Sequence, residues 1–397
     1  MRSLRKPAIA VTASVAALGL LVGVGTVSAA PSASSPVQVT LVGEFTGVVM
    51  YPNLIAGAQA AADAVNASGG IDGRHFQVNT CNTQGVTTPA PSEACAHNVV
   101  SNKADLAVIG TGIDAFATQI NTILNAAHVA NVGDQPLSAA ELSDPNSFPL
   151  VGSEGAAEGD VLADAGYKKI VLAYYGGEEA AAAIDLENAA LKSRGLKLTG
   201  SIPVPPTATD YTPYVASAAS KGNAVAMAVT ATQFAAWLTA AKSGNYTQKL
   251  CLTNQAATAK LLKTLGSKAN GVLVAAGLPP VTDTSLTGIR LFRTQIRKYE
   301  PSAQITEVTL DGWLSAWAFA QVARTIKGTL DRASVLSAWS HLTNFNVFDL
   351  LPPHFTTSKP ASVPGMSRLF NSDIVEGVVK NGSVVATSGW VPVFTRP

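Results

Sequence analysis

The stretch that decides the fold reads GAQAAADAVNASGGIDGR and covers residues 57–74. Its alanine-rich first part predicts a helix that ends at Asn66. Gly69-Gly70 and Asp72-Gly73 then supply turns, because glycine readily adopts the positive φ angles that end helices and form tight turns. An extended segment follows directly over 76–81. Helix, turn and strand in this order predict one unit of an α/β fold.

The same alternation of strands and helices extends to both sides of this stretch. In the first half, strands are expected at 37–43, 76–81, 106–110, 129–132 and 148–151, and helices at 53–66, 92–100 and 115–127. The pattern starts again with strands at 169–174, 198–202, 224–229, 250–252 and 271–276, and helices at 178–194, 211–220, 231–243 and 256–265. Alternating strands and helices indicate βαβ units, so the sequence predicts two doubly wound α/β sets with largely parallel sheets.

The last third of the chain breaks this alternation. After Pro279-Pro280, helices are expected at 285–299, 311–326 and 332–341. The tail over 370–390 is strand-like, and Asn381-Gly382 within it predicts a hairpin turn.

The order of residues in the opening stretch is more specific than the helix, turn and strand that it predicts. A helix that closes on Asn-x-x-Gly-Gly-Ile-x-Gly-Arg, residues 66–74, closely resembles the first helix-to-strand joint of type I periplasmic solute-binding proteins. These are the branched-chain amino-acid-binding group of ABC importers. Segments 350–353, 368–370 and 378–382 also resemble this family, so the resemblance covers about residues 37–394.

The resemblance implies two lobes joined by a three-strand hinge. The chain would cross between the lobes near Val151-Gly152, near Gly277–Pro279 and near Phe345. The first lobe would then hold residues 37–151 and 279–344, and the second lobe residues 152–278 and 345–397. In this arrangement the three late helices return to the first lobe and the tail belongs to the second.

The N-terminal end predicts an export signal over residues 1–29. Arg2, Arg5 and Lys6 precede an apolar run over 8–27, and Val27-Ser28-Ala29 offers a small-residue cleavage site. An uncleaved membrane anchor is the alternative, because the run is near the roughly 20 residues that span a bilayer. The sequence has no cysteine near residue 30, so a lipid anchor is not supported. Residues 30–36 are expected to be a flexible lead-in. We therefore expect an extracytoplasmic protein of the periplasm or cell envelope.

Composition and missing motifs exclude several classes of function. A net charge of +1 with 13% charged residues argues against nucleic-acid binding, which needs a basic face. Three cysteines and five histidines are scattered without the spacing of metal ligands. No dinucleotide-binding glycine motif, phosphate-binding lysine loop or nucleophile elbow is found. We therefore expect no metal, no cofactor and no catalytic residues.

Two of the three cysteines are expected to pair. Cys81 and Cys95 flank a loop rich in Thr, Pro and Gln, and the resembled family often has a disulfide in this loop. A bridge there would close a loop of about 15 residues, worth roughly 3 kcal/mol in the chain-entropy model. Two unpaired thiols are the alternative. Cys251 lies in an apolar run and is expected to be a buried structural thiol.

Loops that follow strands are the expected ligand site, because open α/β sheets bind ligands at the carboxyl ends of their strands. These loops offer hydroxyls, amides, aromatic rings and helix N-termini, which hold a small polar ligand without reacting with it. The predicted ligand-binding residues are Thr46, Tyr51, Thr111, Gly112, Gln135, Tyr175, Thr230 and Asn254. By resemblance, Thr111 would hold a ligand carboxylate. The alternatives are that Thr111 and Thr230 only cap helices, and that Tyr174 replaces Tyr175.

One expected charge is missing from these loops. Amino-acid binders of the family pair the ligand ammonium with an acid, whose usual position falls at Thr253-Asn254-Gln255, where there is none. A buried ammonium without a counter-charge is costly. Either Asp114, Asp134 or Glu178 substitutes, or the ligand is an amide, a small carboxylate, an aromatic acid or a polyol.

Together these features predict a monomeric solute-binding protein. It would close by a hinge motion over a small polar ligand, an amino acid or related amide or carboxylate, and deliver it to the permease subunits of an ABC importer. A ligand sensor that docks on a receptor is one alternative. A two-lobed α/β enzyme is another, and it would need a titratable pair at the site, which the sequence does not reveal.

Overall fold

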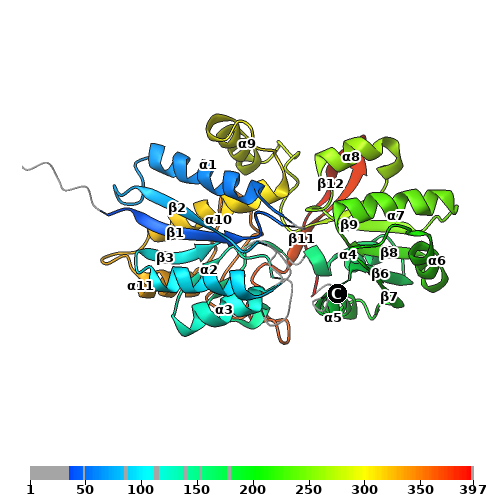
Figure 1. Ribbon diagram of the computed structural model, residues 1–397, viewed down its shortest axis with the longest axis horizontal. Coiled ribbons are helices and arrows are strands. Elements are labelled where there is room, and N and C mark those ends of the chain that lie inside the picture. The colour runs from blue at the N-terminus through cyan, green and yellow to red at the C-terminus, as the bar shows by residue number, and fades with distance from the viewer. Residues whose placement is uncertain are drawn as a thin grey trace, which may run out of the picture. The chain divides into compact units, whose positions relative to one another are not determined.

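The computed structural model describes residues 35–394 except 48–49, 85–87, 111–115, 137–140, 153 and 177–179, and leaves the side chains of 180–182 aside. The predicted export signal and most of the lead-in lie outside the described residues. The chain forms two β-sheets with helices packed against them (Figure 1). The predicted fold class, two doubly wound α/β lobes joined by a three-strand hinge, is confirmed. We call the part built on the first sheet the first lobe and the part built on the other sheet the second lobe.

The sheet of the first lobe is entirely parallel, and its strand order is β2-β1-β3-β4-β5. Its strands are β1 (Val37–Gly43), β2 (Phe76–Asn82), β3 (Asp105–Ile109), β4 (Ala130–Val132) and β5 (Ser147–Phe148). Because all five strands run in the same direction, their carboxyl ends meet at one edge.

Helices cover both faces of this sheet (Figure 1). One face packs on α1 (Asn53–Ala67), α9 (Thr287–Tyr299), α10 (Glu307–Ala323) and α11 (Arg332–Ser340). The other face packs on α2 (Ala90–Ser101) and α3 (Ala117–Ala126). The late helices thus lie on the first sheet although five strands of the second sheet, from Ile170–Tyr175 to Leu273–Ala276, precede them in the chain.

Two glycines let α1 and α10 approach closely. A Cβ atom on Gly57 would lie 2.0 Å from the carbonyl oxygen of Thr309, and one on Gly312 would lie 2.1 Å from the carbonyl oxygen of Leu54. Only residues without a side chain fit at these two positions, so the opening sequence stretch sets the distance between the two helices.

The sheet of the second lobe is mixed, with the strand order β12-β11-β10-β9-β8-β6-β7. Its strands are β6 (Ile170–Tyr175), β7 (Gly200–Val204), β8 (Ala224–Ala228), β9 (Lys249–Thr253), β10 (Leu273–Ala276), β11 (Asp373–Lys380) and β12 (Ser383–Pro392). Strands β6 to β10 pair in parallel, whereas β11 and β12 are antiparallel. The predicted hairpin turn is confirmed, since Asn381 and Gly382 both have positive φ angles, 51° and 76°.

Helices also cover both faces of the second sheet. One face packs on α6 (Thr212–Lys221), α7 (Ala231–Ser243) and α8 (Ala259–Leu265). The other packs on α4 (Glu158–Asp164) and α5 (Ala180–Lys192), and Cys251 is buried there as expected. Within the described residues, three short 3₁₀ turns complete the secondary structure: η1 (Glu141–Ser143), η2 (Glu154–Ala156) and η3 (Gly266–Ala269).

The segments that connect the two sheets lie side by side. The N–H of Gly152 donates to the carbonyl of Gly277 at 3.3 Å, and Asn371 Nδ2 donates to the carbonyl of Leu150 at 2.8 Å. Both glycines are tightly enclosed: a Cβ atom on Gly152 would lie 2.3 Å from the carbonyl oxygen of Asp373, and one on Gly277 would lie 2.6 Å from Val151 Cγ1. The three connections therefore form one compact hinge.

Two helices differ from the sequence prediction. Helix α10 begins at Glu307, one turn before the predicted start at residue 311, because the Thr306 side chain accepts a hydrogen bond from the Thr309 N–H and caps the helix. Helix α4 was not predicted; it has seven residues, too few for a clear hydrophobic period.

A disulfide joins Cys81, in β2, to Cys95, in α2. It ties the outermost strand of the first sheet to a covering helix. Within the described ranges, no helix combines the length and the apolar character that a membrane span requires.

Candidate functional site

Polar side chains from the carboxyl ends of strands in both sheets meet at one place. Gln135 follows β4 of the first sheet, and Asn254 and Gln255 follow β9 of the second sheet. Gln255 Nε2 donates a hydrogen bond to Gln135 Oε1 at 3.1 Å. The two lobes thus contact each other through side chains at the edge where α/β sheets bind ligands.

The first turns of α10 add two carboxyl groups to this place. Glu307 and Asp311 are four residues apart and therefore lie on one face of the helix. Asn254 Nδ2 donates to Glu307 Oε2, and Gln135 Nε2 donates to Asp311 Oδ2. Both acids are buried, with 4% and 1% of their surface exposed.

A third carboxyl group comes from Glu154 in η2, just after the first hinge segment. The Gly277 N–H donates to Glu154 Oε2 at 3.0 Å, and the backbone of Gln255 also hydrogen-bonds to this carboxylate. The carboxyl groups of Glu154 and Glu307 hydrogen-bond to each other, which requires a proton on one of them. We call Glu154, Glu307 and Asp311 the carboxylate cluster.

Burial makes this cluster hold protons. Desolvation raises the pKa of Glu307 well above its usual range, and the neighbouring Glu154 and Asp311 raise it further. The pKa of Asp311 is also raised well above its usual range, by burial and then by Glu154, although the hydrogen bond from Gln135 lowers it in part. Burial likewise raises the pKa of Glu154.

Two tyrosines and a fourth acid lie beside the cluster. Burial raises the pKa of Tyr51, and the charges of Glu44, Glu154 and Tyr175 add to that rise. The Tyr51 N–H donates to the Glu44 carbonyl at 2.7 Å, so the loop after β1 folds back on itself. Of the eight predicted residues, Gln135 and Asn254 thus hydrogen-bond to the cluster, and Tyr51 lies near Glu154 and Tyr175.

The other predicted residues have different surroundings. Thr46 is exposed and accepts a hydrogen bond from Asn82 Nδ2 at 2.7 Å. Thr230 caps α7 through a capping box with Gln233, the alternative that the sequence left open. Thr111 and Gly112 lie outside the described residues, as do Asp114 and Glu178, two of the candidate acids.

Asp134, the remaining candidate acid, is engaged elsewhere. Ser147 Oγ donates to Asp134 Oδ2 at 2.6 Å, and the positive charge of Arg368 acts on the same carboxyl. Burial nevertheless raises the pKa of Asp134 to about 7. The acids that do reach the site, Glu154, Glu307 and Asp311, are ones that the sequence did not indicate.

A family model described as periplasmic binding protein matches residues 36–384. The chain belongs to this family. It is a periplasmic solute-binding protein, as the resemblance of residues 66–74 predicted. No curated protein matches the sequence.

Solved structures of binding proteins share the fold of this one. A possible leucine/isoleucine/valine-binding protein from Rhodopirellula baltica is 18% identical, with a TM-score of 0.73 over 91% of this chain and 98% of that chain. A branched-chain amino acid ABC transporter protein from Thermus thermophilus with bound valine is 16% identical, with a TM-score of 0.75 over 90% and 97%. A fatty acid ABC transporter substrate-binding protein from Thermomonospora curvata is 16% identical, with a TM-score of 0.76 over 90% and 92%. At these identities the likeness shows the fold alone.

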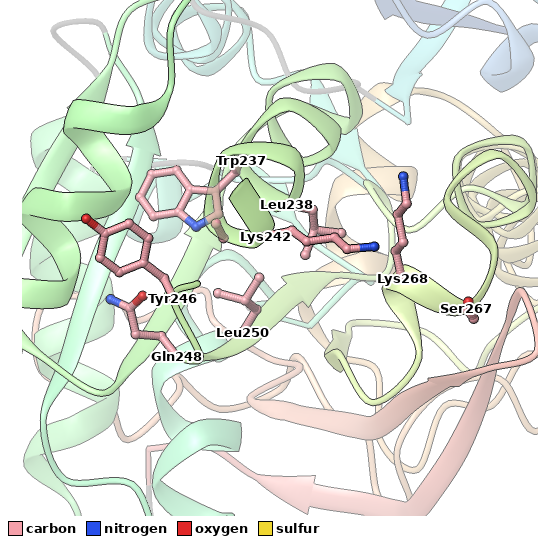
Figure 2. A pocket seen from close by; sticks show the side chains of 9 residues that line it. Trp237, Leu238, Lys242, Tyr246, Gln248, Leu250, Ser267 and Lys268 are labelled. Carbon is pink, nitrogen blue, oxygen red and sulfur yellow. The ribbon is translucent and has the colours of Figure 1, made fainter. Parts of the chain in front are cut away.

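A separate pocket of about 380 Å³ opens in the second lobe of this binding protein, between α7, β9 and η3 (Figure 2). Trp237, Tyr246 and Leu250 line one part of it, and Lys242 and Lys268 line another. Leu250 is near the first residue of β9, whereas Asn254 follows the last. The pocket is therefore distinct from the carboxylate cluster, and its two ammonium groups give it the opposite charge.

The site offers amides that form hydrogen bonds and carboxyl groups that retain protons. The titratable pair Glu154 and Glu307, which the sequence did not reveal, corrects the expectation that the site lacks one. Among the described residues, no serine, cysteine or histidine is hydrogen-bonded to this pair as a nucleophile would be. Nor do the described residues contain three His, Cys, Asp or Glu side chains grouped to hold a metal ion.

Proposed function

We propose that this binding protein captures a small polar ligand, an amino acid or a related amide or carboxylate, between its lobes and delivers it to an ABC importer. The observation that carries the proposal is the set of hydrogen bonds at the strand ends, Gln255 to Gln135 and Asn254 to Glu307. Groups that bond across the two lobes can bond to a ligand held between them, which would then favour closure. Two of the structural neighbours are ABC transporter proteins, which supports the importer as the partner.

The proposed contacts to the ligand are Tyr51, Gln135, Tyr175 and Asn254. Thr111 and Gly112, in the loop after β3, stay predicted contacts for a carboxylate or carbonyl group, because N–H groups at a helix start bind such oxygens. Thr46 and Thr230 stay predictions as well, although each has a hydrogen-bond partner of its own in this structure.

The proposed lobe boundaries follow the hinge. The first two crossings are proposed at Val151-Gly152 and Gly277–Pro279. For the third, Val347, Leu350 and Phe355 pack in the core of the first lobe, and β11 of the second sheet begins at Asp373. These contacts favour a crossing near Asn371 over one near Phe345.

We further propose that residues 1–29 export the protein and that it acts outside the cytoplasm as a monomer. The basic start and apolar run of the sequence support export, and so does membership in a family of periplasmic proteins.

A thermal-shift screen of the mature protein, from Ala30 on, tests the function. The panel contains amino acids, amides, small carboxylates, aromatic acids, sugars and polyamines. A ligand at 100 times its Kd adds about 2.7 kcal/mol to the free energy of unfolding, which raises the Tm clearly. Asn254→Ala should reduce the shift, whereas Gln77→Ala, which removes an exposed amide on β2, should not. A panel that leaves the Tm unchanged throughout would contradict the proposed capture of a small polar ligand.

A further inference from the structure

In the described part of the chain, the carboxylate cluster has acidic groups and amides around it, and no ion pair joins it to a basic side chain. Among the described residues, the ion pairs are those of Arg194 with Asp160 and Asp164, and neither reaches the cluster. The sequence adds to this, because the strand-end loops and the segments that carry the cluster contain no Lys, Arg or His. These stretches are 44–53, 111–114, 133–136, 152–157, 175–178, 230–233, 253–255 and 304–311.

Besides the hydrogen bond that the carboxyls of Glu154 and Glu307 share, two oxygens of the buried acids lack a hydrogen bond from an N–H or hydroxyl group. Glu307 Oε1 and Asp311 Oδ1 receive no hydrogen bond from any amide, hydroxyl or backbone N–H of the described residues. Their other oxygens accept from Asn254 and Gln135. Each of these amides supplies one N–H to a carboxylate that can accept several, whereas an ammonium group supplies three.

Burial of carboxylates without a counter-charge is costly. Such a site either keeps its acids protonated or takes up a cation from outside. Burial raises the pKa of Glu154, Glu307 and Asp311, and repulsion by neighbouring acids adds to the rise for Glu307 and Asp311, so the protein without ligand follows the first course. A bound cation would make the second course favourable.

We propose that the ligand is a small organic cation whose ammonium groups outnumber its carboxylates, an aliphatic diamine or polyamine, held by Glu154, Glu307 and Asp311. The inference rests on the proposed function and narrows its ligand class. The Cβ atoms of residues four apart on a helix lie about 5–6 Å from each other, so Glu307 and Asp311 place two carboxyls side by side, where two ammonium groups of one ligand can reach them. A metal ion is not favoured, since the described acids are not grouped to hold one.

The proposal links binding to proton release. A cation stabilises the ionised acids, so its binding expels the protons that the empty cluster holds. Diamine affinity should therefore increase as the pH rises from about 5 to 8. Among the described residues, the charged groups that act on Glu307 are Glu154 and Asp311, and Glu154 also acts on Asp311; none of them carries a positive charge to offset this effect.

Isothermal titration calorimetry of the mature protein with 1,4-diaminobutane tests the inference. Titrations at pH 6 and pH 8, in two buffers that differ in ionisation enthalpy, count the protons released. Butane-1,4-diol and succinate are matched ligands with the same carbon chain and no positive charge. We expect the diamine alone to bind, tighter at pH 8, with proton release.

Two isosteric variants test the residues. Asp311→Asn and Glu307→Gln should each weaken diamine binding at least tenfold at pH 8, about 1.4 kcal/mol. The control is Asp105→Asn, which changes a buried acid at the start of β3, bonded to Asn79 and Asn102. It should leave the diamine affinity within about twofold. Circular dichroism of each variant establishes that it is folded.

Each contrary outcome has a separate meaning. Binding of succinate or leucine without the diamine would overturn the cationic ligand and leave the solute-binding function standing. Failure of every amine to bind would also overturn the cationic ligand, and the broad panel would then decide the function. Diamine binding that both isosteric variants retain unchanged would overturn the carboxylate cluster as its site. The pocket in Figure 2 would not explain such binding, because Lys242 and Lys268 repel cations.

Discussion

Asp134 and the carboxylate cluster differ in what surrounds each carboxyl. Asp134 accepts a hydrogen bond from Ser147, and Arg368 supplies a positive charge nearby. Arg368 is itself held between the rings of Phe148 and Phe370, 4.4 and 4.6 Å from their centres. Within the described ranges, the neighbours of the carboxylate cluster are amides, a backbone N–H group, tyrosines and further acids. Charge is thus neutralised from within the protein at Asp134 and left for a ligand at the cluster.

The raised pKa of Asp134 predicts a pH dependence of stability. Its pKa is about 7 in the folded protein and about 4 in an unfolded chain, so the folded state binds the proton more tightly. This contribution to stability is complete below pH 4 and is lost as the pH rises to about 7. Asp134→Asn removes the titration, and the Tm should therefore fall less between pH 5 and pH 8 than in the wild type. Thermal unfolding at several pH values measures how the Tm changes with pH.

Asp210→Asn is the control for this experiment. Asp210 is exposed, and hydrogen bonds from Thr212 lower its pKa, so its small contribution to stability has the opposite sign. The acids of the carboxylate cluster contribute equally to the pH dependence of the Tm in both variants. If Asp134→Asn retained the full wild-type slope, Asp134 would not hold its proton to near neutrality.

At the scale of elements, the position of the site depends on one helix pair. Helix α10 carries Glu307 and Asp311, and it packs against α1 through Gly57 and Gly312. The contact is backbone against backbone at both glycines, so neither helix can shift to make room for a side chain.

Gly57→Ala tests this contact, because the sign of the change in the free energy of unfolding shows whether the two helices lie this close together. In a helix with free space, the change stabilises by about 1 kcal/mol through helix propensity. Here the new Cβ atom would lie 2.0 Å from the Thr309 carbonyl oxygen and 2.8 Å from the backbone nitrogen of Trp313. We expect a net loss of about 1–3 kcal/mol, as in overpacked cores. Chemical denaturation measures the change, with Asp63→Ala on the exposed side of α1 as the control.

A stabilised Gly57→Ala variant would contradict the close approach of the two helices. A destabilised Asp63→Ala variant would show that α1 is sensitive to any substitution, and would remove the support that the glycine result gives.

Much of the fold was predictable from local signals in the sequence. Strand β1 over 37–43 and helix α1 from Asn53 follow from an apolar run and an alanine-rich segment bounded by glycines. The register between strands and the return of α9 to α11 to the first sheet depend on contacts between distant residues, and only the family resemblance pointed to the latter. Helix α10 begins earlier than predicted because the Thr306 side chain caps it.

The site was less predictable than the fold. Strand-end loops could be identified, and Gln135 and Asn254 come from them. Glu307 and Asp311 lie on a helix that reaches the site from another part of the chain, so no spacing in the sequence links them to Asn254. The signal that was available is Thr306 followed by Glu307, a helix start with an acid in the first turn.

At the scale of the whole molecule, the hinge and the site share a group. The Gly277 N–H that donates to Glu154 belongs to the second hinge segment, which also lies against Gly152 of the first. A movement of these segments relative to each other would therefore displace a carboxyl of the cluster.

Gly277→Ala should disturb ligand binding more than folding. Its Cβ atom would lie 2.6 Å from Val151 Cγ1 and 2.9 Å from the Gly152 carbonyl oxygen, so the two hinge segments must move apart. We expect the affinity for a ligand identified in the screen to fall roughly tenfold, about 1.4 kcal/mol. Calorimetry measures the affinity, and small-angle X-ray scattering measures whether the ligand still makes the protein more compact.

Gly389→Ala in β12 is the matched control, because no atom lies within 4 Å of the Cβ position there. Wild-type affinity and compaction in Gly277→Ala would mean that the packing of the hinge glycines does not affect binding.

The close contact between α1 and α10 also implies that the association and the dissociation of a ligand depend on different residues. It keeps the acids of α10 in place on the first lobe whether or not the second lobe has moved, so a ligand can dock there before closure. The acids of α10 would then govern how fast a ligand associates. Asn254 and Gln255 of the second lobe would govern how long it stays. Substitutions in the loop after β9 should therefore change the residence time of a ligand and leave its association rate nearly constant.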